Sequence, residues 1–181
     1  MSTKQITRNA VFLALIIIAG LVAIPIPGVP VPIVLQNMII MTTGFFLGKK
    51  NGFITVLAFL FFVFIGMPFL SGGRGGAAIF IGPSGGYLLG YLLSPVIVGF
   101  LLEKIQKVNF LLLAIIYFIG SALLIDILGG FSLAFAGNIS ILSGMKASAT
   151  FLPVDILKVL IAAFVSARLH KYSYSGEKNA R

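Results

Sequence analysis

Two ionisable residues in the last third of the chain could bind a ligand. Asp155 and Lys158 lie three residues apart in the apolar segment PVDILKVLIAAF, a spacing that places both side chains on one face of a helix. Ionisable groups in such apolar helices usually face a protein interior and mark a site or pathway. The carboxylate accepts N–H groups and the ammonium donates to a carbonyl or carboxylate, so the pair could hold a neutral or zwitterionic ligand. The alternative is a self-neutralising ion pair that fixes helix packing.

A second candidate site surrounds Arg74 in a glycine-rich stretch. Gly73, Arg74 and Gly75 belong to the run GGRGG, whose backbone N–H groups are not obstructed by Cβ atoms. With an arginine at its centre, this run could bind an anion such as a carboxylate, and a plain glycine-rich turn is the alternative. The remaining polar groups near the outer third of the spans are Gln36, Asn37 and Tyr87, of which Gln36 and Tyr87 are candidates for ligand contact.

The composition indicates a membrane protein. Of 181 residues, 59% are hydrophobic and only 9% are charged, and no formal charge occurs from Asn9 to Gly48. A soluble domain would carry about a quarter charged residues. The net charge of +9 does not indicate a nucleic-acid partner, because charge-free stretches dominate and no solvated basic face is evident. We therefore expect an integral protein of the cell membrane.

Residue types required by several kinds of catalysis are missing. The sequence has no cysteine, and its single histidine, His170, lies in a basic tail, which excludes thiol chemistry, a histidine metal site and a Ser-His-Asp triad. No G-x-x-x-x-G-K-[ST] segment occurs, so the chain cannot hydrolyse a nucleotide by itself. We expect no catalytic residue, metal or cofactor.

About 20 apolar residues cross a bilayer as a helix, and charges, prolines and glycines divide the chain into six candidates. They are residues 7–24, 33–48, 52–67, 85–102, 110–128 and 154–170. The whole chain, 1–181, is expected to be a single all-α domain of six transmembrane helices. The N-terminus resembles a signal peptide superficially, and we interpret it as an uncleaved first span.

The distribution of cations predicts the orientation of these spans. With six spans both termini share one side, which collects ten cations, whereas Arg74 and Lys146 lie on the other. The positive-inside rule therefore places both termini in the cytoplasm and the ligand pocket on the outward side. The simplest roles of the ten are topology and contact with anionic membrane lipid. They are Lys4, Arg8, Lys49, Lys50, Lys104, Lys107, Arg168, Lys171, Lys178 and Arg181.

A proline-rich loop separates the first two spans. Residues 25–32 read PIPGVPVP and contain half of the eight prolines. Proline removes a backbone donor and restricts the residue before it, so this run cannot be helical and predicts a stiff, extended loop. The four prolines are Pro25, Pro27, Pro30 and Pro32.

Four other features have simple structural interpretations. Residues 68–86 predict a glycine-rich outer loop, and residues 129–152 predict a short outer helix or an extension of the fifth span. Asp126, late in that span, is expected to cap its helix or to bond a Ser or Asn of the following loop. Ala10 and Ala14 form an Ala-x-x-x-Ala pair, a spacing that lets two helices approach closely.

Two of these motifs together resemble the BioY family. GGRGGAAIFIGPSGGYLLGY at residues 72–91 and PVDILK at residues 153–158 are similar to segments of that family, and the resemblance covers essentially the whole chain. Members are the biotin-specific S components of energy-coupling factor (ECF) transporters. The resemblance implies that the chain binds biotin from outside and delivers it by associating with a transmembrane coupling subunit and two ATPase subunits.

The resemblance also implies roles for the candidate residues. Asp155 would accept the ureido N–H groups of biotin, and Lys158 would reach the ureido oxygen or a neighbouring carbonyl. The tail carboxylate would meet the glycine-block amides and Arg74, with the opposite ligand direction as the alternative. The proline-rich loop would act as a lid, and Ala10 and Ala14 would dock on the coupling subunit.

Three other functions fit parts of the sequence. An S component for another vitamin would share the six spans but have different site residues. A stand-alone carrier with Asp155 as a proton-coupled group predicts an inverted repeat, and residues 1–90 and 91–181 share no matching motif. An intramembrane enzyme fits least, because one Asp–Lys pair without a nucleophile or metal set gives no plausible chemistry.

Overall fold

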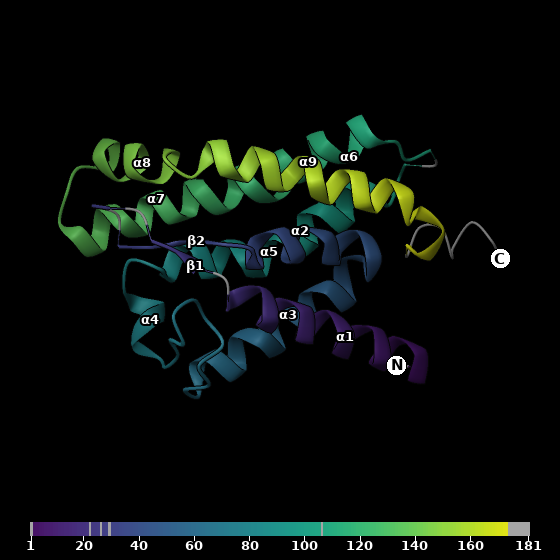
Figure 1. Cartoon of the computed structure of the whole chain (residues 1–181), viewed down its shortest axis with the longest axis horizontal. Coiled ribbons are helices and arrows are strands. Elements are labelled where there is room, and N and C mark those ends of the chain that lie inside the picture. The colour runs from purple at the N-terminus through teal and green to yellow at the C-terminus, as the bar shows by residue number, and fades with distance from the viewer. Residues whose placement is uncertain (1, 22, 26, 29, 106, 174–181) are drawn as a thin grey trace.

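The computed structural model describes residues 2–21, 23–25, 27–28, 30–105 and 107–173. Within these ranges each of the six expected spans coincides with a helical segment, and the segments pack into an elongated bundle (Figure 1). The segments are α1 (Thr3–Gly20), α2 (Gln36–Phe46), α3 (Gly48–Phe64), α5 (Gly85–Leu102), the continuous run α6 (Phe110–Tyr117), η1 (Phe118–Leu123) and α7 (Leu124–Gly137), and α9 (Leu152–Arg168).

Two of the described helices are long and apolar enough to cross a membrane by themselves. These are α5 and the run Phe110–Gly137. The short helix α8 (Ile141–Ala149) and α9 meet the same criterion as a pair that is bent by 49°. Both interpretations of residues 129–152 are therefore correct in part, because the fifth span continues to Gly137 and a short separate helix follows it.

Local sequence explains where several helices begin and end. Ser2 and Gln5 form a capping box at the start of α1, and Ser140 caps α8 by accepting from the Ser143 N–H. Asn138 ends α7 in the left-handed conformation, with φ of 52°. Gly48 joins α2 to α3 with φ of 77°, a conformation that glycine adopts at little cost.

Helix α5 lies in the middle of the bundle, where small residues allow its neighbours to approach closely. A Cβ atom on Gly44 of α2 would lie 2.8 Å from the Pro95 carbonyl, and one on Gly52 of α3 would lie 2.8 Å from the Pro95 Cβ. On its other side, a Cβ on Gly86 would lie 1.9 Å from the Leu128 carbonyl of α7. These contacts hold α2, α3 and α7 against α5 and fix the positions of their polar residues.

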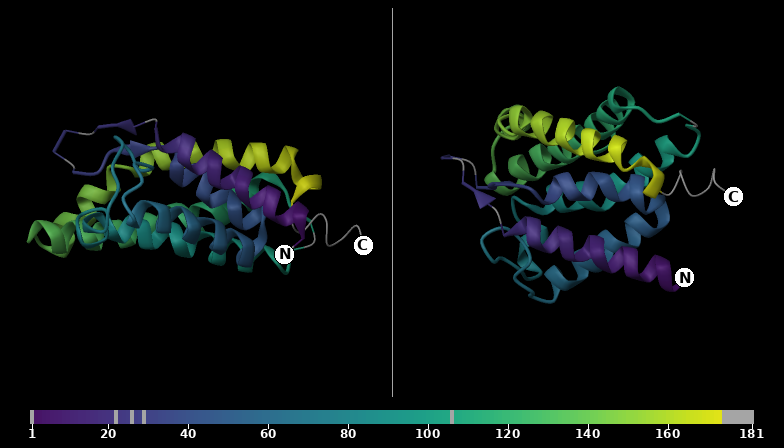
Figure 2. Two further views of the ribbon diagram at one scale, coloured as in Figure 1. Left: turned by 90° about the horizontal axis from the view of Figure 1, so that it is seen from below. Right: turned by 45° about the vertical axis from the view of Figure 1, so that its right-hand side comes forward.

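The two ends of the bundle differ. The start of α1 and the end of α9 lie at one end of the bundle (Figure 2). The Lys49–Glu103 ion pair of 2.8 Å joins the first turn of α3 to the end of α5; Lys178 and Arg181 lie outside the described residues. The opposite end carries a hairpin of β1 (Ala23–Ile24) and β2 (Ile33–Val34), the short helix α4 (Ala78–Ile81) and the α7–α8 turn.

The proline-rich loop lies between the two strands of that hairpin, which is a short addition to an otherwise helical fold. Ala23 pairs with Val34 and Ile24 with Ile33 in an antiparallel arrangement that flanks residues 25–32. Residues 26 and 29 of the loop lie outside the described residues. The short ladder holds the two ends of the loop together at the end of the bundle that carries α4.

Candidate ligand-binding site

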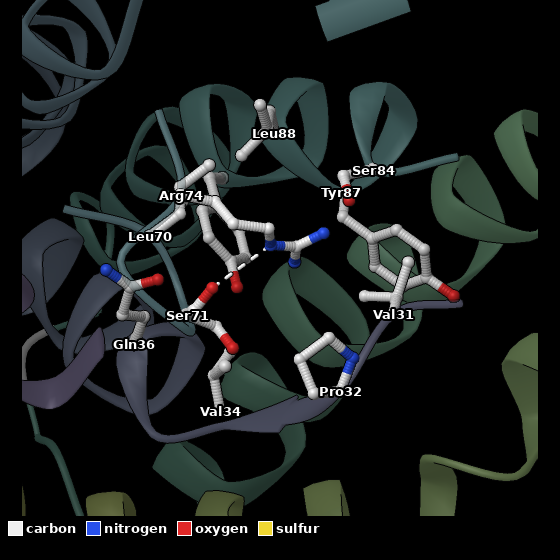
Figure 3. A pocket seen from close by; sticks show the side chains of 11 residues that line it. Val31, Pro32, Val34, Gln36, Leu70, Ser71, Arg74, Ser84, Tyr87 and Leu88 are labelled. Carbon is white, nitrogen blue, oxygen red and sulfur yellow. Dashed lines mark hydrogen bonds between the residues drawn. The ribbon is translucent and has the colours of Figure 1, made fainter. Parts of the chain in front are cut away.

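A small cavity of about 30 Å³ lies beneath the hairpin, at the end of the bundle opposite the start of α1 (Figure 3). Its walls come from the hairpin, the glycine-rich loop and the first turns of α2 and α5. The residues that line it are Val31, Pro32, Val34, Gln36, Leu70, Ser71, Arg74, Ser84, Tyr87, Leu88 and Tyr91. This arrangement brings together Gln36, Arg74 and Tyr87, three of the residues expected to contact a ligand.

A tight turn of the glycine-rich loop positions Arg74. Leu70 and Arg74 pair through backbone hydrogen bonds, and Gly72 and Gly73 make the turn between them with φ of 72° and 70°. The Arg74 Nε donates to the Ser71 carbonyl at 3.0 Å, which aims the guanidinium along the cavity wall (Figure 3). Gly75 has a different role, because a Cβ there would lie 2.2 Å from the Met67 carbonyl.

Arg74 also borders a second hollow of about 330 Å³ on the outer side of the hairpin. Pro32, Ser71 and Arg74 line both spaces and therefore separate the inner cavity from the outer hollow. Pro25 and Pro30 line only the outer one. Pro32 thus lies between the cavity and the outer hollow that Pro25 and Pro30 border.

Gln36, the first residue of α2, is buried, and its side-chain amide holds neighbouring segments together. Its Nε2 donates to the Ile16 carbonyl of α1 at 3.2 Å and to the Phe69 carbonyl of the glycine-rich loop at 2.7 Å. A Cβ on Gly20 would lie 2.2 Å from the same nitrogen, so glycine at that position leaves room for the amide. The Gln36 side chain therefore ties α1 to the loop that carries Arg74.

Tyr87 connects the cavity to helices α7 and α8. Its hydroxyl donates to Ser148 Oγ at 3.0 Å, and that hydroxyl donates to the Asp126 backbone carbonyl at 2.7 Å. Its ring packs edge-on against Phe151, with 5.8 Å between the centroids. A Cβ on Gly129 would lie 2.2 Å from the ring, so this glycine provides the space that Tyr87 occupies.

Asp155 and Lys158 form a buried ion pair on one face of α9, as their spacing predicts. The Lys158 Nζ lies 2.8 Å from the Asp155 Oδ1, and both residues are at least 96% buried. The Asn37 side chain of α2 completes the cluster, because its Nδ2 donates to Asp155 Oδ1 at 2.8 Å and its Oδ1 accepts from Lys158 Nζ at 3.0 Å. We call these three side chains the α2–α9 polar cluster.

Asp126 is buried on α7 without such partners. Among the described residues, no hydrogen-bond partner reaches either of its carboxylate oxygens. The expectation that it caps its helix is wrong, because the helical run continues beyond it to Gly137 and Asn138 provides the end. The expected hydrogen bond to a serine is made by the Asp126 backbone carbonyl, which accepts from Ser148, and not by the carboxylate.

The cavity and the α2–α9 polar cluster are adjacent. Gln36 of α2 lines the cavity, and the next residue, Asn37, belongs to the cluster. Tyr91 lines the cavity one helical turn after Tyr87. The cluster itself holds one carboxylate and one ammonium, those of Asp155 and Lys158. Such a group can accept N–H donors and donate to one carbonyl; a cluster of three or more residues suited to a metal ion is not found in the described part of the chain.

Sequence reasoning did not assign Asn37 and Tyr91 to the site. Asn37 is a polar residue in an otherwise apolar run, next to Gln36. Its hydrogen-bond partners lie on α9, and the sequence does not show that α2 and α9 are in contact. Tyr91 follows Tyr87 by four residues, so the two share one face of α5. That spacing could have identified it.

Comparison with known proteins places this geometry in a family. Residues 1–174 match the BioY family. The chain is 42% identical over 172 residues to the biotin transporter BioY of Lactococcus lactis subsp. cremoris, covering 93% of this chain and 91% of that protein. It is 36% identical over 182 residues to the biotin transporter BioY of Rhizobium etli, covering 91% and 92% of the two chains.

A solved structure has the same fold. The crystal structure at 2.1 Å of the S-component for biotin from an ECF-type ABC transporter superposes with a TM-score of 0.89 and 41% sequence identity, over 94% of this chain and 95% of that one. The resemblance seen in the two sequence motifs is therefore confirmed, and the apolar helices are those of a multi-pass membrane protein. This chain belongs to the BioY family.

Proposed function

We propose that this protein is the biotin-binding S component of an ECF-type vitamin uptake transporter. The observation that carries the proposal is the match in fold to an S-component for biotin over 94% of this chain, at 41% sequence identity. The lidded cavity beside a buried Asp–Lys pair supports it, because an ECF S component for a small vitamin needs an enclosed site with few polar groups.

The α2–α9 polar cluster suits the ureido ring of biotin. This ring offers N–H donors and one carbonyl acceptor, which match the Asp155 carboxylate and the Lys158 ammonium. The Asn37 carboxamide presents the same pattern to the same two charges, an N–H toward Asp155 and a carbonyl oxygen toward Lys158. We infer that the ureido edge takes the place of Asn37 when biotin binds.

The other end of biotin suits the glycine-rich loop. The carboxylate of the valerate tail would pair with Arg74, while Gln36, Gly73 and Gly75 keep the loop in its turn and Tyr87 covers the bicyclic ring. A cavity of about 30 Å³ is far smaller than the roughly 300 to 1,000 Å³ typical of ligand sites. Entry of biotin therefore requires movement of the hairpin.

The lid consists of the loop that holds Pro25, Pro27, Pro30 and Pro32. Three of these prolines border the cavity or the hollow outside it. A stiff loop loses little conformational entropy when it closes, which favours tight binding.

Delivery of the vitamin requires other subunits. We propose that a transmembrane coupling subunit docks on the face of α1 that carries Ala10 and Ala14 and that two ATPase subunits drive the cycle. Both alanines are exposed, so this face is accessible for a close helix–helix contact.

Identification of the bound ligand tests the proposed vitamin. The protein is purified in detergent, denatured, and its released small molecules are analysed by mass spectrometry, followed by calorimetric titration with biotin. We expect biotin in the extract and saturable binding. Thiamine or riboflavin in the extract, with no heat from biotin, would contradict the assignment to biotin.

Substitution of the small residues of α1 tests docking. Ala10→Trp or Ala14→Trp should leave biotin binding unchanged and abolish ATP-driven uptake in vesicles that contain the complete transporter. Leu111→Trp, at an exposed position on α6, is the control and should retain uptake. Equal loss of binding and uptake in the alanine variants would assign these residues a structural role instead.

A further inference from the structure

The segment GPSGGY at residues 82–87, where α5 begins, borders the ligand cavity and is held in place by close contacts (Figure 3). The hydroxyl of Ser132 on α7 donates to the Pro83 carbonyl at 2.7 Å. A Cβ atom on Gly85 would lie 2.2 Å from a backbone carbonyl of α4, so the chain passes closely against that helix. Ser84 lies between these two contacts, and its side chain lines the cavity. Its position is therefore fixed before a ligand binds.

The hydroxyl of Ser84 has no hydrogen-bond partner in the described part of the chain, although the residue is only 8% exposed. A serine that caps a helix has extended backbone angles, which let its side chain accept from an N–H of the first turn. Ser84 stands at the cap position of α5 with φ of −85° and ψ of −13°, which are helical angles, and its side chain makes no cap bond. This buried hydroxyl is therefore available to a ligand in the cavity.

The glycine-rich loop brings further donors to the same cavity. Ser71 is 5% exposed and lines the cavity, and none of the described residues bonds to its hydroxyl. The Arg74 Nε donates to the Ser71 carbonyl, whereas the two terminal nitrogens of the guanidinium have no partner among the residues that the structure describes. Figure 3 shows the guanidinium extending from the loop in the direction of Ser84. Two hydroxyls and a guanidinium thus border one small space.

These three side chains are suited to an anion. Arg74 carries the only formal charge among the described residues that line the cavity, and a guanidinium has donors but no acceptor. A buried hydroxyl without a partner costs free energy, and this cost is removed when a ligand oxygen accepts from it. A carboxylate has two acceptor oxygens, which can accept from the guanidinium and from both hydroxyls. A neutral amide fits less well, because its NH₂ group would face further donors.

We propose that Ser84 and Ser71 complete, with Arg74, a carboxylate subsite that restricts the ligand to molecules with a free terminal carboxylate. This inference rests on the proposed function, and it adds the two serines to the residues that select the vitamin. Biotin presents such a carboxylate at the end of its valerate tail. Amides of biotin, including those that join the tail to a lysine side chain, lack the charge and one acceptor oxygen. The subsite therefore admits the free vitamin and rejects the vitamin that is still attached to a peptide.

Calorimetric titration of the purified protein with a pair of ligands tests this subsite. Biotin and biotinamide share the ring system and the tail, and they differ only in whether the tail ends in a carboxylate or in a neutral amide. Each ligand is titrated into the wild type, Ser84→Ala and Ser84→Thr, of which the threonine variant keeps a hydroxyl. Ser94→Ala is the matched control, because Ser94 is a buried serine of the same helix whose hydroxyl donates to Ser121 Oγ at 2.6 Å.

We expect the wild type to bind biotin about 100-fold more tightly than biotinamide, because the amide leaves buried donors unsatisfied. Ser84→Ala should weaken biotin binding by about tenfold, the effect of roughly one hydrogen bond to a charged group, and leave biotinamide binding nearly unchanged. Ser84→Thr and Ser94→Ala should keep the wild-type preference. Ser71→Ala should lower the preference as Ser84→Ala does, which provides a second test if the latter variant does not fold.

Three results would overturn the subsite while leaving biotin binding intact. Equal affinity of the wild type for biotin and biotinamide would mean that the cavity does not select a carboxylate. An unchanged preference in both Ser84→Ala and Ser71→Ala would mean that the hydroxyls do not contact the tail. Equal losses for the two ligands in Ser84→Ala would assign Ser84 a structural role. Failure of the wild type to bind either ligand would overturn the proposed function as well.

Discussion

Asp155 and Asp126 are two buried carboxylates on helices α9 and α7, and their surroundings are opposite. Both are at least 95% buried. Asp155 bonds to a lysine and to an asparagine, whereas neither Asp126 oxygen has a partner among the described residues. Burial alone therefore does not distinguish a carboxylate in a candidate ligand site from a buried carboxylate without hydrogen-bond partners. The difference lies in partners, because only the Asp155 cluster offers both a donor and an acceptor to a ligand.

The largest change in stability is expected when Asp155 loses the lysine that pairs with it, because its carboxylate then resembles that of Asp126. Lys158→Met leaves a buried carboxylate with Asn37 as its remaining partner in the cluster. Breaking a buried pair from one side costs about 3 to 5 kcal/mol. We expect a loss of that size in reversible denaturation in detergent micelles.

The double variant Lys158→Met with Asp155→Leu provides the control for this loss. Removal of both charges should recover most of the stability, since apolar residues replace buried ion pairs at little cost. A double variant as unstable as the single one would show that lost packing, and not the unpaired charge, causes the effect.

Asp126→Asn should change stability in the opposite direction and make the protein more stable. It replaces a buried ionisable group without partners by a neutral amide of similar shape, and leaving such a group unsatisfied costs about 1 to 3 kcal/mol. We expect the free energy of unfolding to rise by part of this amount in the same denaturation experiment. A marked loss of stability would mean that Asp126 has a partner that the described residues do not include.

Asn37→Leu sharpens the comparison by removing the amide that resembles the ligand. Biotin would no longer have to displace Asn37, so affinity measured by calorimetry should rise by about tenfold, the equivalent of roughly one hydrogen bond. Thr43→Ala, at another buried polar residue of α2, should leave affinity unchanged. Weaker binding by Asn37→Leu would instead make Asn37 a direct contact of biotin.

The smallest effect is expected at Arg74, which is half-buried and reaches solvent through the outer hollow. A partly exposed charge contact contributes at most about 1 kcal/mol, so Arg74→Gln should weaken biotin binding by about fivefold. Lys146→Gln, the other cation at this end of the bundle, is the matched control and should have no effect. A biotin derivative without the tail carboxylate should bind both proteins equally, and a persistent difference would argue for the opposite ligand direction.

Much of the fold followed from patterns that are local in the sequence. Charge-free runs predicted the six helical segments, and the prolines predicted a break between the first two. The end of the fifth span was left open between residue 128 and an extension beyond it, because the glycine pair Gly129 and Gly130 follows Leu128. In the structure they lie within α7, where Gly129 provides space for Tyr87 and Gly130 packs against Met145 of α8. A sequence does not show whether a glycine ends a helix or admits a neighbour.

The candidate site was predicted as far as spacing within one element allows. Asp155 and Lys158 pair as their i, i+3 positions predict, and the glycine-rich loop makes the turn that presents Arg74. The partners from other elements could not be predicted, because Asn37 is 118 residues from Asp155 along the chain. For the same reason the sequence could not distinguish Asp126 from Asp155. Both are single acidic residues in apolar helices, and tertiary packing gives Asp155 a partner from another helix.

Calorimetric titration of biotin into wild-type protein, Asp155→Asn and Asp126→Asn tests most directly whether the paired carboxylate is the one that holds the vitamin. Both substitutions remove one carboxylate with little change of shape, so they differ only in which acid is lost. We expect Asp155→Asn to weaken binding by about tenfold or more, as for the loss of a charged hydrogen bond, and Asp126→Asn to bind like the wild type. Unchanged affinity in Asp155→Asn, or an equal loss in Asp126→Asn, would contradict the assignment.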